Sequence, residues 1–170
     1  AKFKSRFPPN SVLWVAGSTH APEENIVLDA FNNIKHEYPQ LKLIIVPRHP
    51  QRFDDVAAMA PDAMRLSECP NEDITSEVVI ADVMGQLRML YCACDFVFMG
   101  GSIAERGGHN PLEAALYNKP IMMGPSRQNN LQACQLLDAA GAMTAASDAE
   151  SIALQLKSWL ENPVKAVEQG

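Results

Sequence analysis

Short apolar runs alternate with segments of helical periodicity along the whole chain, and this alternation restricts the fold more than any other feature. Mostly aliphatic runs predict strands over residues 12–16, 41–46, 78–81, 96–99 and 120–123. Shorter or weaker strand patterns lie near residues 64–66 and over residues 142–145. Helical patterns lie over residues 22–38, 52–59, 86–93, 131–139 and 148–160, and a further helix begins after Asn110. Strand and helix thus alternate about six times. The pattern predicts a doubly wound, Rossmann-like α/β fold with a parallel sheet of about six strands covered on both faces.

The length of 170 residues suits one domain. Hydrophobic residues make up 47% of the chain and charged residues 20%, which excludes a disordered protein. We expect a linker-like start over residues 1–10, a domain over residues 11–162 and a tail over residues 163–170. The chain begins with Ala1 rather than Met, and we expect it to be a piece of a longer protein.

Charge and cysteine content exclude several classes of protein. The net charge of −6 does not suit a nucleic-acid binder, so a few placed groups must hold any anionic ligand. No apolar run approaches the roughly 20 residues that a membrane-spanning helix needs. Cys92 and Cys94 are one residue apart, which is not the usual spacing of zinc ligands. We expect the four cysteines to be buried free thiols.

Polar and glycine-rich residues collect in the loops that follow the predicted strands. Ligands of doubly wound folds bind at the carboxyl ends of the strands. The loops at that edge are residues 17–20, 47–50, 82–86, 100–110 and 124–130. The sequence therefore predicts a binding site at this edge of the sheet.

The most informative of these loops reads Gly-Gly-His-Asn-Pro-Leu-Glu over residues 107–113. Its glycines allow a ligand to approach the backbone, and the helix that follows offers free N–H groups to one phosphate. Glu113 is placed to accept hydrogen bonds from two ribose hydroxyls. The alternative is that Asn110 and Glu113 only cap the helix. Neither a P-loop nor a G-x-G-x-x-G motif is present, so a dinucleotide cofactor is not supported.

Other charged residues follow the second strand. Arg48 can pair with a phosphate, or it can be an ordinary surface arginine on a turn. His20, His49 and His109 share the edge, but their spacing does not indicate a metal site. Asp54 and its neighbour Asp55 are expected to serve the first turn of a helix rather than a metal.

These loops together resemble those of the 3-deoxy-D-manno-octulosonic acid (Kdo) transferases, which are GT-B glycosyltransferases. The matching strings are residues 14–20 (Trp-Val-Ala-Gly-Ser-Thr-His), 46–50 (Val-Pro-Arg-His-Pro), 84–85 (Met-Gly), 100–102 (Gly-Gly-Ser) and 105–113 (Glu-Arg-Gly-Gly-His-Asn-Pro-Leu-Glu). They occur in the family's order over nearly the whole chain. The resemblance implies the C-terminal half of a two-domain enzyme, the half that binds CMP-Kdo.

The resemblance also implies site residues. The nucleotide contacts would be Pro47, Arg48, Met84, Gly85, Gln86, Asn110, Pro111, Leu112 and Glu113. Candidate donor contacts are Ser18, His20, His49, Gly101, Ser102, Gly107, Gly108 and His109. No metal, no cofactor and no catalytic residue is implied in this chain.

Two departures from the family pattern stand out. The family commonly has Met-Gly-Glu where this chain has Gln86, which removes a charge. It also commonly has Gly-Pro-His-x-x-Asn-Phe, where this chain has Ser126 and Asn130 in place of the histidine and the phenylalanine. No role is carried over to Ser126 or Asn130.

For the whole protein, the resemblance implies transfer of Kdo from CMP-Kdo to a lipid A precursor at the cytoplasmic face of the bacterial inner membrane. The membrane anchor, the acceptor site and the catalytic base would belong to an N-terminal half that this chain lacks. The alternatives are a donor domain for another nucleotide sugar, and a nucleotide-binding or protein-interaction module with no transfer role.

Overall fold

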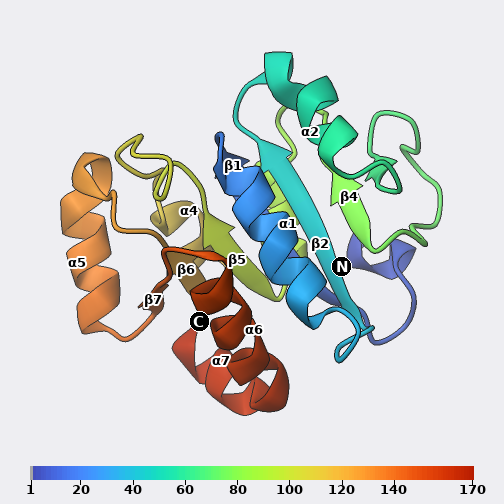
Figure 1. The fold of residues 1–170 in the computed structure, drawn as a ribbon. Coiled ribbons are helices and arrows are strands. Elements are labelled where there is room, and N and C mark those ends of the chain that lie inside the picture. Colours follow the sequence, from blue (N-terminus) through green and yellow to red (C-terminus); the bar gives the residue numbers. More distant parts are fainter. Residues whose placement is uncertain (1) are drawn as a thin grey trace.

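The computed structural model describes residues 2–170, and one sheet of seven parallel strands runs through that part of the chain (Figure 1). The strands are β1 (Val12–Thr19), β2 (Leu41–Pro47), β3 (Met64–Arg65), β4 (Val78–Ile80), β5 (Phe96–Met99), β6 (Ile121–Met123) and β7 (Met143–Ala145). Their order across the sheet is β3-β4-β2-β1-β5-β6-β7. The predicted doubly wound α/β fold is confirmed, with seven strands rather than about six.

Seven α-helices accompany the sheet in the described residues. They are α1 (Glu23–Ile34), α2 (Phe53–Met59), α3 (Leu87–Ala93), α4 (Leu112–Ala115), α5 (Leu131–Ala139), α6 (Ala149–Glu161) and α7 (Pro163–Gln169). Short 3₁₀ helices are η1 (Lys4–Arg6), η2 (Pro50–Arg52) and η3 (Gln128–Asn130). None of the helices in residues 2–170 combines the length and the apolar content needed to cross a bilayer.

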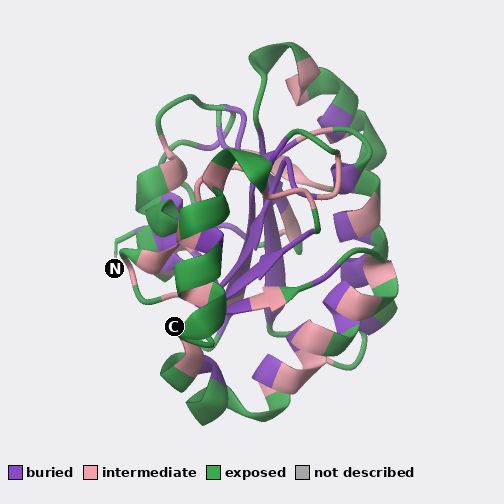
Figure 2. Cartoon of the chain, turned by 90° about the vertical axis from the view of Figure 1, so that its left-hand side faces the viewer, coloured by how far each residue is buried: buried purple, intermediate pink, exposed green. Residues whose placement is uncertain are grey.

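Alternate residues of the central strands pack into two separate cores. Leu13 and Val15 of β1 pack with α3, α4 and α5 on one face, whereas Trp14 and Ala16 pack with α1 and α6 on the other. Side chains of a strand point to opposite faces in turn, so both faces of a central strand must be apolar when helices cover both. Figure 2 shows the buried strands between outer layers whose exposed side faces solvent.

Both ends of the chain differ from the expected linker and tail. Phe3 and Phe7 are buried in the core, and the backbone N–H of Ile74 donates to the Arg6 carbonyl at 2.7 Å. At the other end α7 packs against α6, and its Gln169 accepts a hydrogen bond from the indole of Trp159 at 2.8 Å. The sequence pattern missed these segments because each buries only a few side chains, which is too few to give a periodic signal.

The cysteines are free throughout the described residues. Cys69, Cys94 and Cys134 are buried as expected, and burial raises the pKa of the Cys94 thiol to about 12. Cys92 differs from the expectation and is exposed, because α3 turns this position away from the sheet.

Candidate functional site

A cavity of about 250 Å³ opens at the carboxyl ends of β1, β2 and β4. β2, β3 and β4 lie on one side of β1 in the sheet, and β5, β6 and β7 lie on the other. The loops after β1 and β5 therefore diverge, which leaves space for a ligand between them. The residues that line the cavity are Ser18, Val46, Pro47, Arg48, Phe53, Ala81, Val83, Met84, Gly85, Gln86, Leu87, His109 and Glu113. Most of the residues expected from the sequence to contact a nucleotide therefore lie around one cavity, which we call the nucleotide pocket after that expectation.

A larger hollow lies at the opposite edge of the sheet, between residues 4–12 and residues 73–75. It is at the amino ends of the strands, where doubly wound folds do not bind their ligands. We therefore assign the site to the nucleotide pocket.

Arg48 forms one wall of the nucleotide pocket. Its backbone N–H donates to the carbonyl of Thr19 at 3.0 Å, which ties the end of β2 to the end of β1. The side chain is exposed, and the guanidinium has no ion pair or hydrogen bond within the described residues. The arginine is therefore positioned by its backbone while its charge stays free for an anion.

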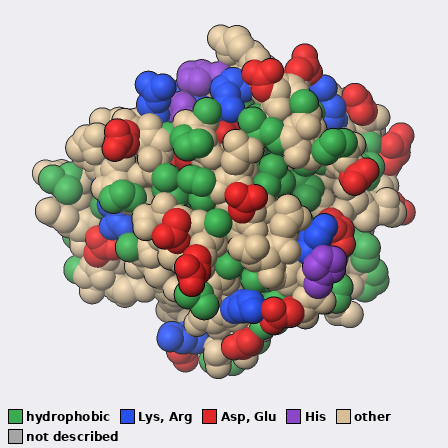
Figure 3. Space-filling view, viewed as in Figure 1, with side chains coloured by type: hydrophobic (Ala, Val, Ile, Leu, Met, Phe, Trp, Pro, Cys, Tyr) green, Lys and Arg blue, Asp and Glu red, His purple; other side chains and the backbone are tan. Residues whose placement is uncertain are grey.

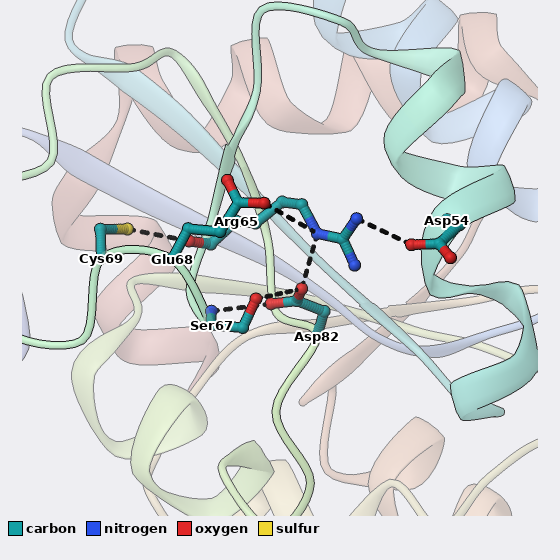
Figure 4. A network of polar contacts seen from close by, with 6 residues as sticks. All are labelled: Asp54, Arg65, Ser67, Glu68, Cys69 and Asp82. Atoms are coloured by element: carbon teal, nitrogen blue, oxygen red, sulfur yellow. Dashed lines mark hydrogen bonds and ion pairs between the residues drawn. The ribbon is translucent and has the colours of Figure 1, made fainter.

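The loop over residues 82–86 forms a second wall, and a buried carboxylate anchors its beginning (Figure 4). Asp82 accepts hydrogen bonds from the hydroxyl of Ser67 at 2.6 Å, from the Ser67 backbone N–H at 2.9 Å and from Arg65 Nε at 2.7 Å. Burial alone would raise the pKa of Asp82, but these hydrogen bonds outweigh it and lower that pKa below its usual value. The anchor leaves Met84 and Gly85 exposed at the pocket.

Glu113 reaches the pocket from the start of α4. The helix begins at Leu112, with Pro111 rather than the expected Asn110 directly before it, and Asn110 Oδ1 accepts a hydrogen bond from the N–H of Leu112 at 3.1 Å. The other half of a capping box is missing, because the Glu113 side chain has no hydrogen-bond partner in the part of the chain that the structure describes. Its carboxylate is exposed and lines the pocket instead.

The helix end itself is smaller than the sequence suggested. α4 has only four residues, and its macrodipole is correspondingly weak. Pro111 is buried and Leu112 is exposed, and neither lines the nucleotide pocket. The structure therefore favours Arg48 over the helix end as the partner of a phosphate.

The glycine-rich loop after β5 is anchored by Glu23, the first residue of α1. The Glu23 carboxylate is fully buried. It accepts backbone N–H hydrogen bonds from His20 at 3.0 Å, Gly101 at 2.8 Å, Ser102 at 2.9 Å, Ile103 at 2.9 Å and Ala104 at 3.2 Å. One carboxylate thus fixes the loops that follow β1 and β5 relative to each other.

The glycines of this loop serve internal packing. A Cβ on Gly107 would lie 2.3 Å from the side chain of Asn129, and one on Gly108 would lie 2.3 Å from Met123 Cε. Their N–H groups donate to Ser126 Oγ and to the Gly101 carbonyl, respectively. The structure therefore does not bring Gly107 and Gly108 into the pocket. Gly101 and Ser102 are likewise buried, with N–H groups bonded to Glu23.

Three histidines lie beside the nucleotide pocket. The Nε2 atoms of His20 and His109 are 2.8 Å apart, and their rings are parallel within 3°. The ring of His49 meets that of His20 edge-on, with centroids 5.3 Å apart. Burial, reinforced by the positive charges of His20, Arg48 and His49, lowers the pKa of His109 to about 4. Burial also lowers the pKa of His20.

Two of these histidines, His20 and His49, line a second cavity of about 260 Å³, together with Ala21, Arg52 and Arg106. Figure 3 shows histidine side chains between Lys or Arg side chains at the upper edge of the molecule. Residues 2–170 contain no group of three or more His, Cys, Asp or Glu side chains arranged to hold a metal ion.

Comparison with known proteins identifies the family. The chain is 32% identical over 157 residues to the 3-deoxy-D-manno-octulosonic acid transferase of Haemophilus influenzae, which covers 88% of this chain and 36% of that protein. The crystal structure of the C-terminal CMP-Kdo binding domain of WaaA from Acinetobacter baumannii matches with a TM-score of 0.82 and 33% identity, over 95% of this chain and 88% of that one. This chain belongs to the Kdo transferase family.

A further relative and a further solved structure also match the chain. The Rickettsia typhi Kdo transferase is 27% identical over 175 residues, which cover 94% of this chain and 38% of that protein. The chain therefore spans less than two fifths of the length of these two relatives. The Anabaena HepE structure in complex with UDP and glucose shares the fold, with a TM-score of 0.65 and 19% identity over 94% of this chain and 41% of that one. No family model matches the chain.

The structure explains how this Kdo transferase domain accommodates its departures from the family pattern. Ser126 Oγ accepts the N–H of Gly107 at 3.0 Å, and Asn130 Nδ2 donates to the Gly108 carbonyl at 2.9 Å. Both residues thus support the glycine-rich loop. Gln86 is half-buried and lines the nucleotide pocket, where it keeps its hydrogen-bonding groups without a charge.

Proposed function

We propose that this Kdo transferase chain binds CMP-Kdo and serves as the donor domain of a longer enzyme. The observation that carries the proposal is the gathering of Arg48, residues 84–86 and Glu113 around one pocket at the carboxyl edge of the sheet. An unpaired arginine suits the phosphate, and an unpaired carboxylate suits the ribose hydroxyls. The domain similar to this chain in Acinetobacter baumannii is a CMP-Kdo binding domain by name.

In the reaction that we propose, an acceptor hydroxyl attacks the anomeric carbon of Kdo and CMP leaves. The charge of the leaving phosphate grows as the bond breaks, so a guanidinium already in place stabilises the transition state more than the ground state. We assign the stabilisation of the leaving phosphate to Arg48. No group in the described residues is assigned as the base that removes the acceptor's proton.

The whole protein would transfer Kdo to a lipid A precursor at the cytoplasmic face of the bacterial inner membrane. The acceptor site and the base would lie outside this chain. We therefore expect the purified 170-residue chain to fold without transferring sugar. Kdo transfer to a lipid A precursor by this chain alone would contradict the division of roles.

Titration of the chain with CMP, CDP, UMP and UDP, followed by NMR or calorimetry, tests the assignment. We expect CMP to bind at least tenfold more tightly than UMP, which corresponds to about 1.4 kcal/mol. Preference for UDP would instead indicate a donor domain for another nucleotide sugar. HepE, which shares the fold, was solved in complex with UDP and glucose. Absence of binding to any of the four nucleotides would contradict a donor role.

A further inference from the structure

The second cavity shares a wall with the nucleotide pocket. His109 lines the nucleotide pocket and His20 lines the second cavity, and their Nε2 atoms are 2.8 Å apart. A group joined to the phosphate of a nucleotide in the first pocket would therefore extend past this histidine pair into the second cavity. Its volume of about 260 Å³ is just below the usual range for small-molecule sites, so it suits a single sugar rather than a longer chain.

The second cavity is basic although the chain as a whole carries a net charge of −6. Arg106 and Arg52 both line it, together with His20 and His49. Arg52 forms an ion pair with the fully buried Glu24, so part of its charge is already neutralised. The guanidinium of Arg106 is exposed and has no partner within residues 2–170, which leaves its charge available.

The nearby acidic side chains do not cancel the charge of Arg106. Glu23 is buried and its carboxylate is occupied by five backbone N–H groups. Glu24 is paired with Arg52. Glu105 precedes Arg106 and is exposed, but it does not line the second cavity.

The proposed donor has a charge pattern that matches the two cavities. A sugar acid such as Kdo carries a carboxylate on its anomeric carbon, the same carbon that is bonded to the phosphate. The donor therefore presents two negative charges in succession, one on the phosphodiester and one on the carboxylate. The chain presents two unpaired arginines in the same succession, Arg48 at the nucleotide pocket and Arg106 at the second cavity.

We propose that the cavity lined by His20, His49 and Arg106 is the subsite for the carboxylate of a sugar acid, with Arg106 as its ionic partner. This inference rests on the proposed function, because it needs a nucleotide in the first pocket. A guanidinium matches the two oxygens of a carboxylate, and the imidazoles beside it supply further hydrogen-bonding groups. The subsite would select donors by the acid group of their sugar, which CMP alone lacks.

The test compares the affinities of CMP and CMP-Kdo for the wild-type chain and for Arg106→Ala, by calorimetry. We expect wild type to bind CMP-Kdo more tightly than CMP. Arg106→Ala should weaken CMP-Kdo binding at least tenfold and change CMP binding by less than twofold. Arg106→Lys keeps the charge but lacks the planar set of guanidinium donors, so its affinity for CMP-Kdo should lie between those of wild type and Arg106→Ala. Lys165→Ala is the matched control, because it removes one exposed positive charge from α7 and should change neither affinity.

The outcomes separate this subsite from the proposed function. If wild type binds CMP but binds CMP-Kdo no more tightly, the subsite is wrong and the donor domain stands. An equal loss of both ligands in Arg106→Ala, or no loss of either, would also overturn the subsite. If wild type binds neither ligand, the proposed function fails and the subsite fails with it. Thermal unfolding should be the same for Arg106→Ala and wild type, because this exposed side chain has no internal partner.

Discussion

The side chain of Asn110 accepts the backbone N–H of Leu112 at 3.1 Å and thereby caps the turn that precedes Glu113. Because asparagine makes this bond by itself, the glutamate is not needed for the cap. Its carboxylate is exposed at the nucleotide pocket, without a partner in the described residues. The arrangement separates the stability of the turn from the recognition of a ligand.

Glu113→Gln should weaken CMP binding by tenfold or more, about 1.4 kcal/mol, and leave the unfolding free energy unchanged within about 0.5 kcal/mol. The amide replaces one acceptor with a donor and removes the charge that strengthens both hydrogen bonds to the ribose. Calorimetric titration and thermal unfolding measure the two effects.

The control for Glu113→Gln is a change in the ligand. 2′,3′-Dideoxy-CMP lacks the hydroxyls that Glu113 would hold, so it should bind wild type and variant almost equally. A mutation that weakened both ligands by the same factor would show a general effect on the turn rather than contact with the ribose.

Arg48→Ala should weaken CMP binding by about 1.5–3 kcal/mol, the usual contribution of a hydrogen bond to a charged group. Its stability should stay near wild type, because the guanidinium has no partner within the described residues. Lys165→Ala, which removes an exposed charge from α7, is the matched control for affinity. Equal affinities of these two variants would refute the role of Arg48.

Arg52→Ala should act differently from Arg48→Ala and mainly destabilise the fold. Arg52 pairs with Glu24, whose side chain is fully buried, and removal of the arginine leaves that charge without a partner. The expected loss is about 3 kcal/mol or more of unfolding free energy, measured by denaturant titration. An unfolding midpoint equal to that of wild type would show that Glu24 does not depend on this ion pair.

Glu23→Gln should also lower the unfolding free energy, by about 2 kcal/mol or more. The amide presents its own N–H groups to backbone donors and leaves some of the five buried or half-buried N–H groups unpaired. Glu150→Gln makes the same chemical change on the exposed first turn of α6 and should cost less than about 0.5 kcal/mol. Similar losses in the two variants would contradict the role of Glu23 as an anchor.

Stability should fall as the pH is lowered from about 6.5 to about 4. The pKa of His109 is about 4 in the folded chain, lowered by burial and by the charges of His20, Arg48 and His49. The ordinary value in an unfolded chain is about 6.5. Between these values the unfolded state binds more protons, so the contribution of His109 is complete above pH 6.5 and is lost toward pH 4.

Denaturant unfolding at several pH values measures this effect. We expect His109 to account for about 1–3 kcal/mol of the loss between pH 6.5 and pH 4, after allowance for its partial exposure. His109→Gln should therefore show a smaller slope of unfolding free energy against pH than wild type. His36→Gln removes an exposed histidine and should keep the wild-type slope. Parallel curves for wild type and His109→Gln would contradict the prediction.

Local sequence patterns were sufficient for the sheet and for the edge that carries the site. The strand over residues 96–99 and the helix over residues 131–139 have the predicted bounds, because each is a continuous apolar run or a full helical stripe. The carboxyl edge followed from the alternation of strand and helix, since that order places all loops of one kind on the same side.

Tertiary structure alone decided how the loops meet. The Glu23 carboxylate holds Gly101, 78 residues away, and His20 contacts His109, 89 residues away. Neither contact leaves a periodic trace in the sequence, because each depends on the packing of β1 beside β5. The glycines at positions 107 and 108 predicted close approach of a ligand to the backbone, but both are buried against Asn129 and Met123. Local chemistry therefore determined which segments form strands, helices and loops. Contacts between distant segments determined the direction in which each polar group points.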